Sequence, residues 1–145
     1  MALTLAQLAQ LKTELETDPN GYGYAPHVAS GSDNQLAALL NLARPAIRIN
    51  RGFVSTQELV EAIVQSEMPS NANQRDWLIM VTQGDRVRVD TGSTARAGLV
   101  AIFGAATVTR ANLLAISERD GSRAEQLFGR DVRVTDVEVG LALRG

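Results

Sequence analysis

The sequence predicts a mainly α-helical protein: a compact single-domain bundle of six to seven short helices with one or two short extended or β-ribbon segments. Leucines recur at helical spacing near the N-terminus, and Ser–Glu pairs three residues apart form capping boxes further along the chain. The composition is 45% hydrophobic but only 4% aromatic, so the core must be aliphatic. Cores rich in leucine and alanine favour close helix packing. A length of 145 residues fits one helical domain over residues 1–145.

The first two helices are predicted from leucine spacing. A helix over residues 4–16 begins near Thr4 or Ala2 and ends at Asp18-Pro19, because the residue before a proline avoids the α region. Residues 17–32 are expected to form an opening loop. A second helix over residues 34–43 is capped by Ser32 or Asp33 and ended by Pro45.

The middle of the chain alternates between extended and helical patterns. Residues 46–54 alternate apolar and polar side chains, which indicates an extended connection or a short strand. Ser55 and Glu58 form a capping box that opens a helix over residues 56–67. A further helix is expected over residues 72–83. Residues 84–92 are compatible with either a β-ribbon or an extended loop.

The C-terminal third is predicted to be helical again. Residues 93–103 and 108–118 read as two helices separated by Gly104, the second capped by Thr107 or Thr109. Ser122 and Glu125 repeat the capping box and begin a short helix that ends near Gly129. Residues 132–134 are extended, and Thr135 or Asp136 caps a final turn or helix that reaches Leu143.

The opening loop contains the segment TDPNGYGYAPHV, residues 17–28, which is the part of the chain that most resembles a ligand site. A dinucleotide fingerprint fails there, because position 26 is proline and a helix precedes the loop. A calcium loop starting at Asp18 fails as well, since its fifth position is Tyr22 and its twelfth is Ala29 instead of glutamate. A tight turn fits better, with Gly21 and Gly23 supplying positive φ angles. A partner-binding loop is the other interpretation.

Other catalytic and metal-binding patterns are missing from the sequence. There are no cysteines, His27 is the only imidazole, and neither HExxH nor GxSxG occurs. The acidic pairs fall on predicted helix surfaces, where solvation explains them. We therefore predict no catalytic, cofactor-binding or metal-binding residues, no cofactor and no enzymatic activity.

The charge pattern argues against nucleic acid and membranes as partners. The net charge is −2 and acidic residues are interspersed with arginines, whereas duplex binders present a basic face. No apolar run approaches the roughly 18 residues of a membrane span, and the N-terminus does not resemble a signal peptide. We expect a soluble protein made in a reducing cytoplasm. Lys12 is the only lysine beside 13 arginines, which suits protein interfaces or reflects a GC-rich genome.

A family resemblance covers nearly the whole chain. It rests on LKTELETDPNGYGYA near the N-terminus, Leu40-Asn41, Trp77, IFGAATVTRANLLAI at 102–116, and SRAEQLFGRDVRVTDVEVGLA at 122–142. With these motifs the sequence resembles a family of small proteins encoded in tailed phages and prophages. The relatives often carry Arg or Leu in place of Asn20 and Tyr22. The shared motifs are turns, caps and core positions, so they identify a fold family and not an active site.

The resemblance implies a virion structural protein at the head–tail connector (neck) or the tail. Such a protein would be made in the host bacterial cytoplasm, would act in several copies as a homo-oligomer or ring, and would contact portal, connector or tail proteins. The expected interface anchors lie in the opening loop and in segment 84–92: Asp18, Tyr22, Tyr24, Arg86 and Arg88. The alternative is a small phage-encoded hydrolase or regulatory protein on the same scaffold, with its chemistry at His27 and Asp18.

Overall fold

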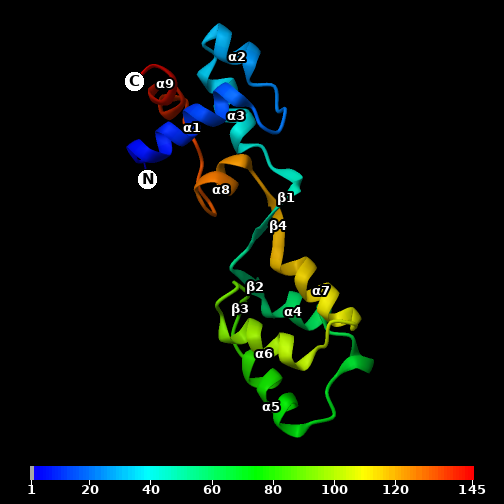
Figure 1. Ribbon diagram of the computed structural model, residues 1–145. Coiled ribbons are helices and arrows are strands. Elements are labelled where there is room, and N and C mark those ends of the chain that lie inside the picture. The colour runs from blue at the N-terminus through cyan, green and yellow to red at the C-terminus, as the bar shows by residue number, and fades with distance from the viewer. Residues whose placement is uncertain (1) are drawn as a thin grey trace. The chain divides into compact units, whose positions relative to one another are not determined.

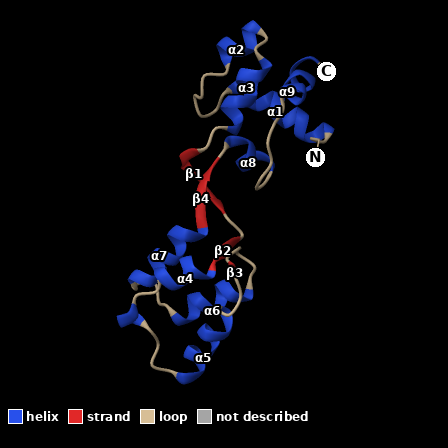
Figure 2. Cartoon of the chain, turned by 180° about the vertical axis from the view of Figure 1, so that it is seen from behind, coloured by secondary structure: helices blue, strands red, loops and turns tan. Residues whose placement is uncertain are grey.

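The computed structural model describes residues 2–145 and confirms the mainly helical class. Nine α-helices occur in this range, more than the six to seven predicted, together with a few short strands (Figures 1 and 2). The chain divides into two compact units, one formed by the residues up to Ile47 together with Asp120–Gly145, the other by Arg48–Arg119. We call them unit 1 and unit 2. The expectation of one domain over 1–145 stays a prediction.

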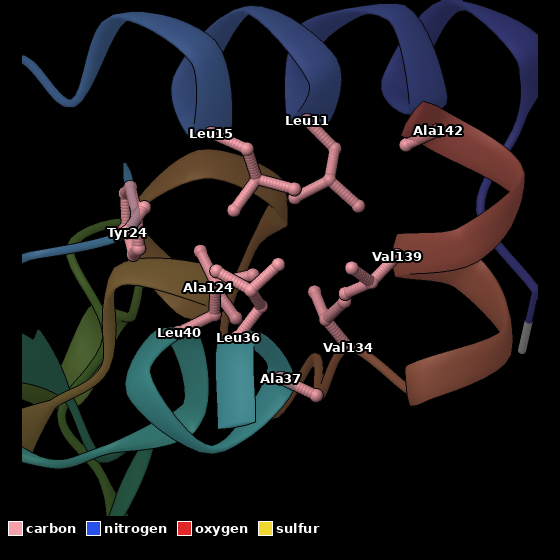
Figure 3. Close-up of a cluster of buried hydrophobic side chains, with 10 residues drawn as sticks. All are labelled: Leu11, Leu15, Tyr24, Leu36, Ala37, Leu40, Ala124, Val134, Val139 and Ala142. Carbon is pink, nitrogen blue, oxygen red and sulfur yellow. The ribbon is translucent and has the colours of Figure 1, made fainter. Parts of the chain in front are cut away.

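Unit 1 consists of five helices around an aliphatic core. Its helices are α1 (Leu5–Thr17), α2 (Ala25–Ser30), α3 (Asp33–Asn41), α8 (Arg123–Phe128) and α9 (Asp136–Arg144). Helices α1 and α3 both pack against α9. Figure 3 shows Leu11 and Leu15 of α1 pointing toward Leu36 and Leu40 of α3, and all four side chains are at most 2% exposed. The helical leucine spacing therefore predicted the helix correctly, and Leu11 and Leu15 lie on its buried side, whereas Leu5 is 87% exposed.

Unit 2 packs four helices and one 3₁₀ turn around a β-ribbon. The helical elements are α4 (Thr56–Ala62), the turn η1 (Gln65–Glu67), α5 (Ala72–Val81), α6 (Thr94–Ile102) and α7 (Val108–Ser117). The ribbon pairs β2 (Phe53–Ser55) antiparallel with β3 (Arg86–Arg88), with Phe53 opposite Arg88. Segment 84–92 therefore contributes a true strand. The buried core of unit 2 contains Val54, Leu59, Leu78, Val87, Val89, Leu99 and Phe103.

A second two-stranded sheet pairs β1 (Arg44–Asn50) with β4 (Glu118–Gly121). The boundary between the two units falls within both strands. The alternation of residues 46–54 predicted the extended conformation of β1 and β2. Strand β4 was missed: the predicted helix over residues 108–118 ends at Ser117, and residues 119–121 were assigned to no element.

The predicted opening loop over residues 17–32 contains a helix that sequence reasoning missed. Helix α2 has Pro26 in its first turn, where the missing N–H of proline costs nothing, and Gly31 ends it in the left-handed conformation. The prediction for the preceding turn was correct: Gly21 and Gly23 have φ angles of 68° and 87°. A side chain at either position would strain the backbone.

The predicted helix over residues 56–67 ends early, at Ala62, because side chains of α7 bind the backbone at that point. Asn112 donates to the carbonyl of Ala62 at 3.0 Å, and the amide of Val64 donates to Thr109 Oγ1 at 2.9 Å. In a continuing helix, the Ala62 carbonyl and the Val64 amide would instead form hydrogen bonds within the helix. Glu67 then accepts the amides of Val108 and Thr109 at 2.9 and 2.7 Å, at the start of α7. Tertiary hydrogen bonds thus replace the end of the helix.

The capping boxes at Ser55 and Ser122 are confirmed, and Thr135 begins a third in this part of the chain. The Ser55 box is reinforced by Arg51, whose guanidinium donates to both carboxylate oxygens of Glu58, at 2.7 and 3.1 Å. The hydrogen bonds from Arg51, followed by the amide of Ser55, lower the pKa of Glu58 to about 2 from an ordinary 4.5. This carboxylate therefore favours the folded state only while it is ionised.

Replacing Glu58 with glutamine should make the stability of the protein less dependent on pH. A folded pKa below the unfolded value stabilises the fold fully above about pH 4.5, and this contribution disappears as the pH falls toward 2. Glutamine keeps the capping box but removes the charge. We expect Glu58→Gln to unfold at lower urea than the parent protein at pH 7, and the difference to shrink toward pH 2.5. If the urea midpoints of the two proteins differed equally at both pH values, the lowered pKa of Glu58 would be contradicted.

Candidate interaction surface

The side chain of Asp18 organises the loop between α1 and α2. The backbone of Asp18 adopts a φ of 42°, and its N–H caps α1 by donating to the carbonyl of Glu14. Its carboxylate accepts the amides of Tyr22 at 2.7 Å, Gly23 at 2.8 Å and Tyr24 at 3.3 Å. Burial alone would raise the pKa of Asp18, but these hydrogen bonds outweigh it and hold the pKa below its ordinary value. Asp18 therefore shapes the loop, and its role as an interface anchor stays a prediction.

Tyr24 is the largest fully buried side chain of unit 1 (Figure 3). Its hydroxyl donates to Glu14 Oε1 at 3.3 Å, and Arg123 holds the same carboxylate from α8 with hydrogen bonds of 2.8 and 2.7 Å. Burial and the charge of Glu14 raise the pKa of Tyr24. With no exposed surface, Tyr24 offers nothing to another protein. The prediction that it anchors an interface was wrong, because a short loop brings it directly back onto the core.

Tyr22 lies at the edge of the same cluster and is partly exposed. Its ring meets that of Tyr24 edge-on, with centroids 6.0 Å apart. The guanidinium carbon of Arg44 lies 3.8 Å from the centroid of the Tyr22 ring, a cation–π contact. Arg44 thus covers one face of Tyr22. The polar groups and tyrosine rings of the opening loop are thus held largely by contacts within the protein, as the tight-turn interpretation predicts.

The suggested pairing of His27 with Asp18 does not form. His27 belongs to α2, and within residues 2–145 no hydrogen bond or ion pair joins it to Asp18. The Asp18 carboxylate instead accepts three backbone amides of its own loop, so the orienting hydrogen bond of a catalytic triad is not formed between these two residues.

The β2–β3 ribbon does bring predicted anchors together. Arg86 and Arg88 are exposed and flank Phe53 of the neighbouring strand, with guanidinium carbons 4.3 and 6.0 Å from the centroid of its ring. Phe53 is 39% exposed, a high value for a phenylalanine. Asp90 accepts a 2.6 Å hydrogen bond from Arg88 and steadies that side chain. We call Phe53, Arg86 and Arg88 the ribbon patch.

Phe53 is the interface candidate that sequence reasoning missed. The alternation of residues 46–54 could have indicated it, since alternate residues of a strand share one face. The missing information was the partner strand: Phe53 meets the arginines only because β2 pairs with β3 in the observed register. A contact between residues more than thirty positions apart cannot be read from local pattern.

No group of three or more His, Cys, Asp or Glu side chains within residues 2–145 is arranged to hold a metal ion. None of the helices found there combines the length and the apolar character needed to span a membrane.

Comparison of the chain with family models, curated proteins and solved structures found no match. The resemblance to small tailed-phage proteins therefore stays a prediction from the sequence motifs.

Proposed function

We propose that this protein is a bacteriophage virion structural or assembly protein, placed at the head–tail connector or the tail, which acts through protein–protein contacts in a multi-copy assembly. The observation that carries the proposal is the ribbon patch, where two arginines flank an exposed aromatic ring. Arginine and aromatic side chains are enriched at interfaces and among binding hot spots. The placement in a virion follows from the sequence resemblance. The proposed partners are portal, connector or tail proteins and further copies of this chain.

The ribbon patch is suited to a partner surface with carboxylates. Arg86 has no ion pair within the described range and lies beside a shallow groove that runs from β3 to the start of α6, lined by Val81, Ser93, Thr94 and Ala95. A planar guanidinium stacked on a ring stays free to donate hydrogen bonds in its own plane. A partner carboxylate can therefore bind Arg86 without breaking an existing contact.

The experiment is co-sedimentation of the tagged protein with phage particles. We expect the parent protein to be incorporated, and Phe53→Ala and Arg86→Ala each to reduce incorporation by about tenfold or more, the effect of losing a hot-spot contact. Val108→Ser is the matched control, because Val108 is an exposed apolar residue of the same unit outside the patch. Parent protein that never co-sediments would refute the virion placement. Normal incorporation of both patch variants would refute the role of the patch.

A further inference from the structure

A second surface of unit 2 is an apolar groove between α4, η1 and α5, away from the ribbon patch residues. Its volume is about 340 Å³, and it is lined by Val60, Ile63, Gln65, Met68, Arg75, Leu78, Ile79 and Thr82. Three of its apolar side chains are strongly exposed: Val60 at 54%, Met68 at 40% and Ile79 at 60%. Apolar side chains gathered in this way mark a binding surface more often than single exposed ones do.

The charge of the groove is positive. Arg75 is the only charged residue that lines it, and no carboxylate does. The guanidinium of Arg75 donates to the carbonyl of Ser70 at 3.3 Å and makes no ion pair within the part of the chain that the structure describes. An occupant that is apolar and carries one acidic group would therefore complement the groove.

Helix α9 of unit 1 has such a face. Val137 and Leu141 lie one helical turn apart, at 67% and 51% exposure, while Glu138, Val139 and Ala142 occupy the buried side of the helix. Residues at i and i+4 lie on the same face of a helix, so the two exposed side chains form one short apolar ridge. Asp136 is the exposed first residue of α9, next in sequence to Val137, and the only hydrogen bond of its carboxylate in residues 2–145 comes from the Val137 amide, at 2.9 Å.

We infer that helix α9 of one copy docks into the α4–α5 groove of a second copy, with Val137 and Leu141 among the apolar side chains and Asp136 against Arg75. The inference rests on the proposed function, because it supplies the contact between copies that a multi-copy assembly needs. It follows the helix-in-groove mode of recognition, in which an apolar ridge provides the anchors. Because groove and ridge are different surfaces, the contact is heterologous and generates a ring or an open chain of subunits.

The test is analytical ultracentrifugation of the full-length protein over a range of concentrations. We expect the parent protein to self-associate and Ile79→Asp to raise the dissociation constant by about tenfold or more, since a buried charge opposes docking. Met80→Asp is a matched control: Met80 neighbours Ile79 on α5 and is equally exposed at 60%, but it does not line the groove. Circular dichroism and Trp77 fluorescence would establish that both variants are folded.

A charge exchange tests the pairing itself. Arg75→Asp and Asp136→Arg should each weaken association by about fivefold, and the double variant should restore it to within about threefold of the parent protein. Equal effects of Ile79→Asp and Met80→Asp, a lack of rescue in the double variant, or a parent protein that stays monomeric would each overturn the inference. Co-sedimentation with particles measures the proposed function separately. Groove variants that still self-associate like the parent protein but no longer bind virions would identify a different protein as the occupant, and so also refute it.

Discussion

Replacing Arg123 with alanine is expected to lower the free energy of unfolding by about 3–5 kcal/mol, the cost of leaving a buried charge without its partner. Arg123 is 15% exposed and Glu14 only 3% as side chains, and two hydrogen bonds join them. Without the guanidinium, the Glu14 carboxylate keeps one long hydrogen bond, from the hydroxyl of Tyr24. The Glu14 side chain is only 3% exposed in the folded protein, so its charge is largely shielded from water when Arg123 is lost.

The measurement is urea unfolding followed by tyrosine fluorescence, because both tyrosines of the chain, Tyr22 and Tyr24, belong to unit 1. Lys12→Ala is the control. The pair of Lys12 with Glu16 joins half-exposed side chains at 3.9 Å, and such a surface pair contributes about 0.5 kcal/mol or less. A loss below about 1 kcal/mol in Arg123→Ala would show that the Glu14 carboxylate is solvated or neutral instead of paired.

Replacing Gly98 with alanine is expected to destabilise unit 2 by about 2 kcal/mol, although alanine is the better helix former. A Cβ atom at this position in α6 would lie 2.3 and 2.4 Å from two ring carbons of Trp77 in α5. Helix propensity favours alanine by about 1 kcal/mol, whereas forcing an extra carbon into a packed contact costs about 1–3 kcal/mol or more. The clash prevails here because a rigid indole ring has to leave its site.

Trp77 is the only tryptophan, so its fluorescence reports this change directly. We expect a red-shifted emission in the folded Gly98→Ala variant and a lower urea midpoint. Gly104→Ala is the matched control, since a Cβ there meets nothing within 4 Å and the glycine has no positive φ. That variant should be neutral or slightly more stable. An unchanged tryptophan spectrum in Gly98→Ala would contradict the close approach of α5 and α6.

Local signals in the sequence predicted helix starts more reliably than helix ends. The capping boxes at Ser55 and Ser122 form as expected, because each is complete within four residues and needs no distant partner. The end of α4 was wrong by several residues, since hydrogen bonds with Asn112 and Thr109 of α7 decide it. Helix α2 was missed for a different reason: it is a short helix of one proline-initiated turn and a half inside a glycine-rich segment, where turn signals dominate.

The candidate surface was predictable in part. Arg86 and Arg88 were correctly placed on an exposed extended segment, since their alternation with apolar residues is a local property. Tyr24 was misjudged because a tyrosine in a loop can point to solvent or to the core with the same local sequence. Burial here depends on Glu14 and Arg123, which come from two other helices.

The sequence by itself determined the mainly helical class, the capping boxes and the positive-φ glycines of the opening turn, because each follows from interactions between residues a few positions apart. Only the tertiary structure decided which side chains are available to a partner. It buried Tyr24 over a paired carboxylate, brought Phe53 close to two arginines of another strand, and left a groove open beside Ile79. These outcomes depend on contacts between residues distant in the chain, and the free energy of such contacts is set by packing and desolvation, not by local pattern.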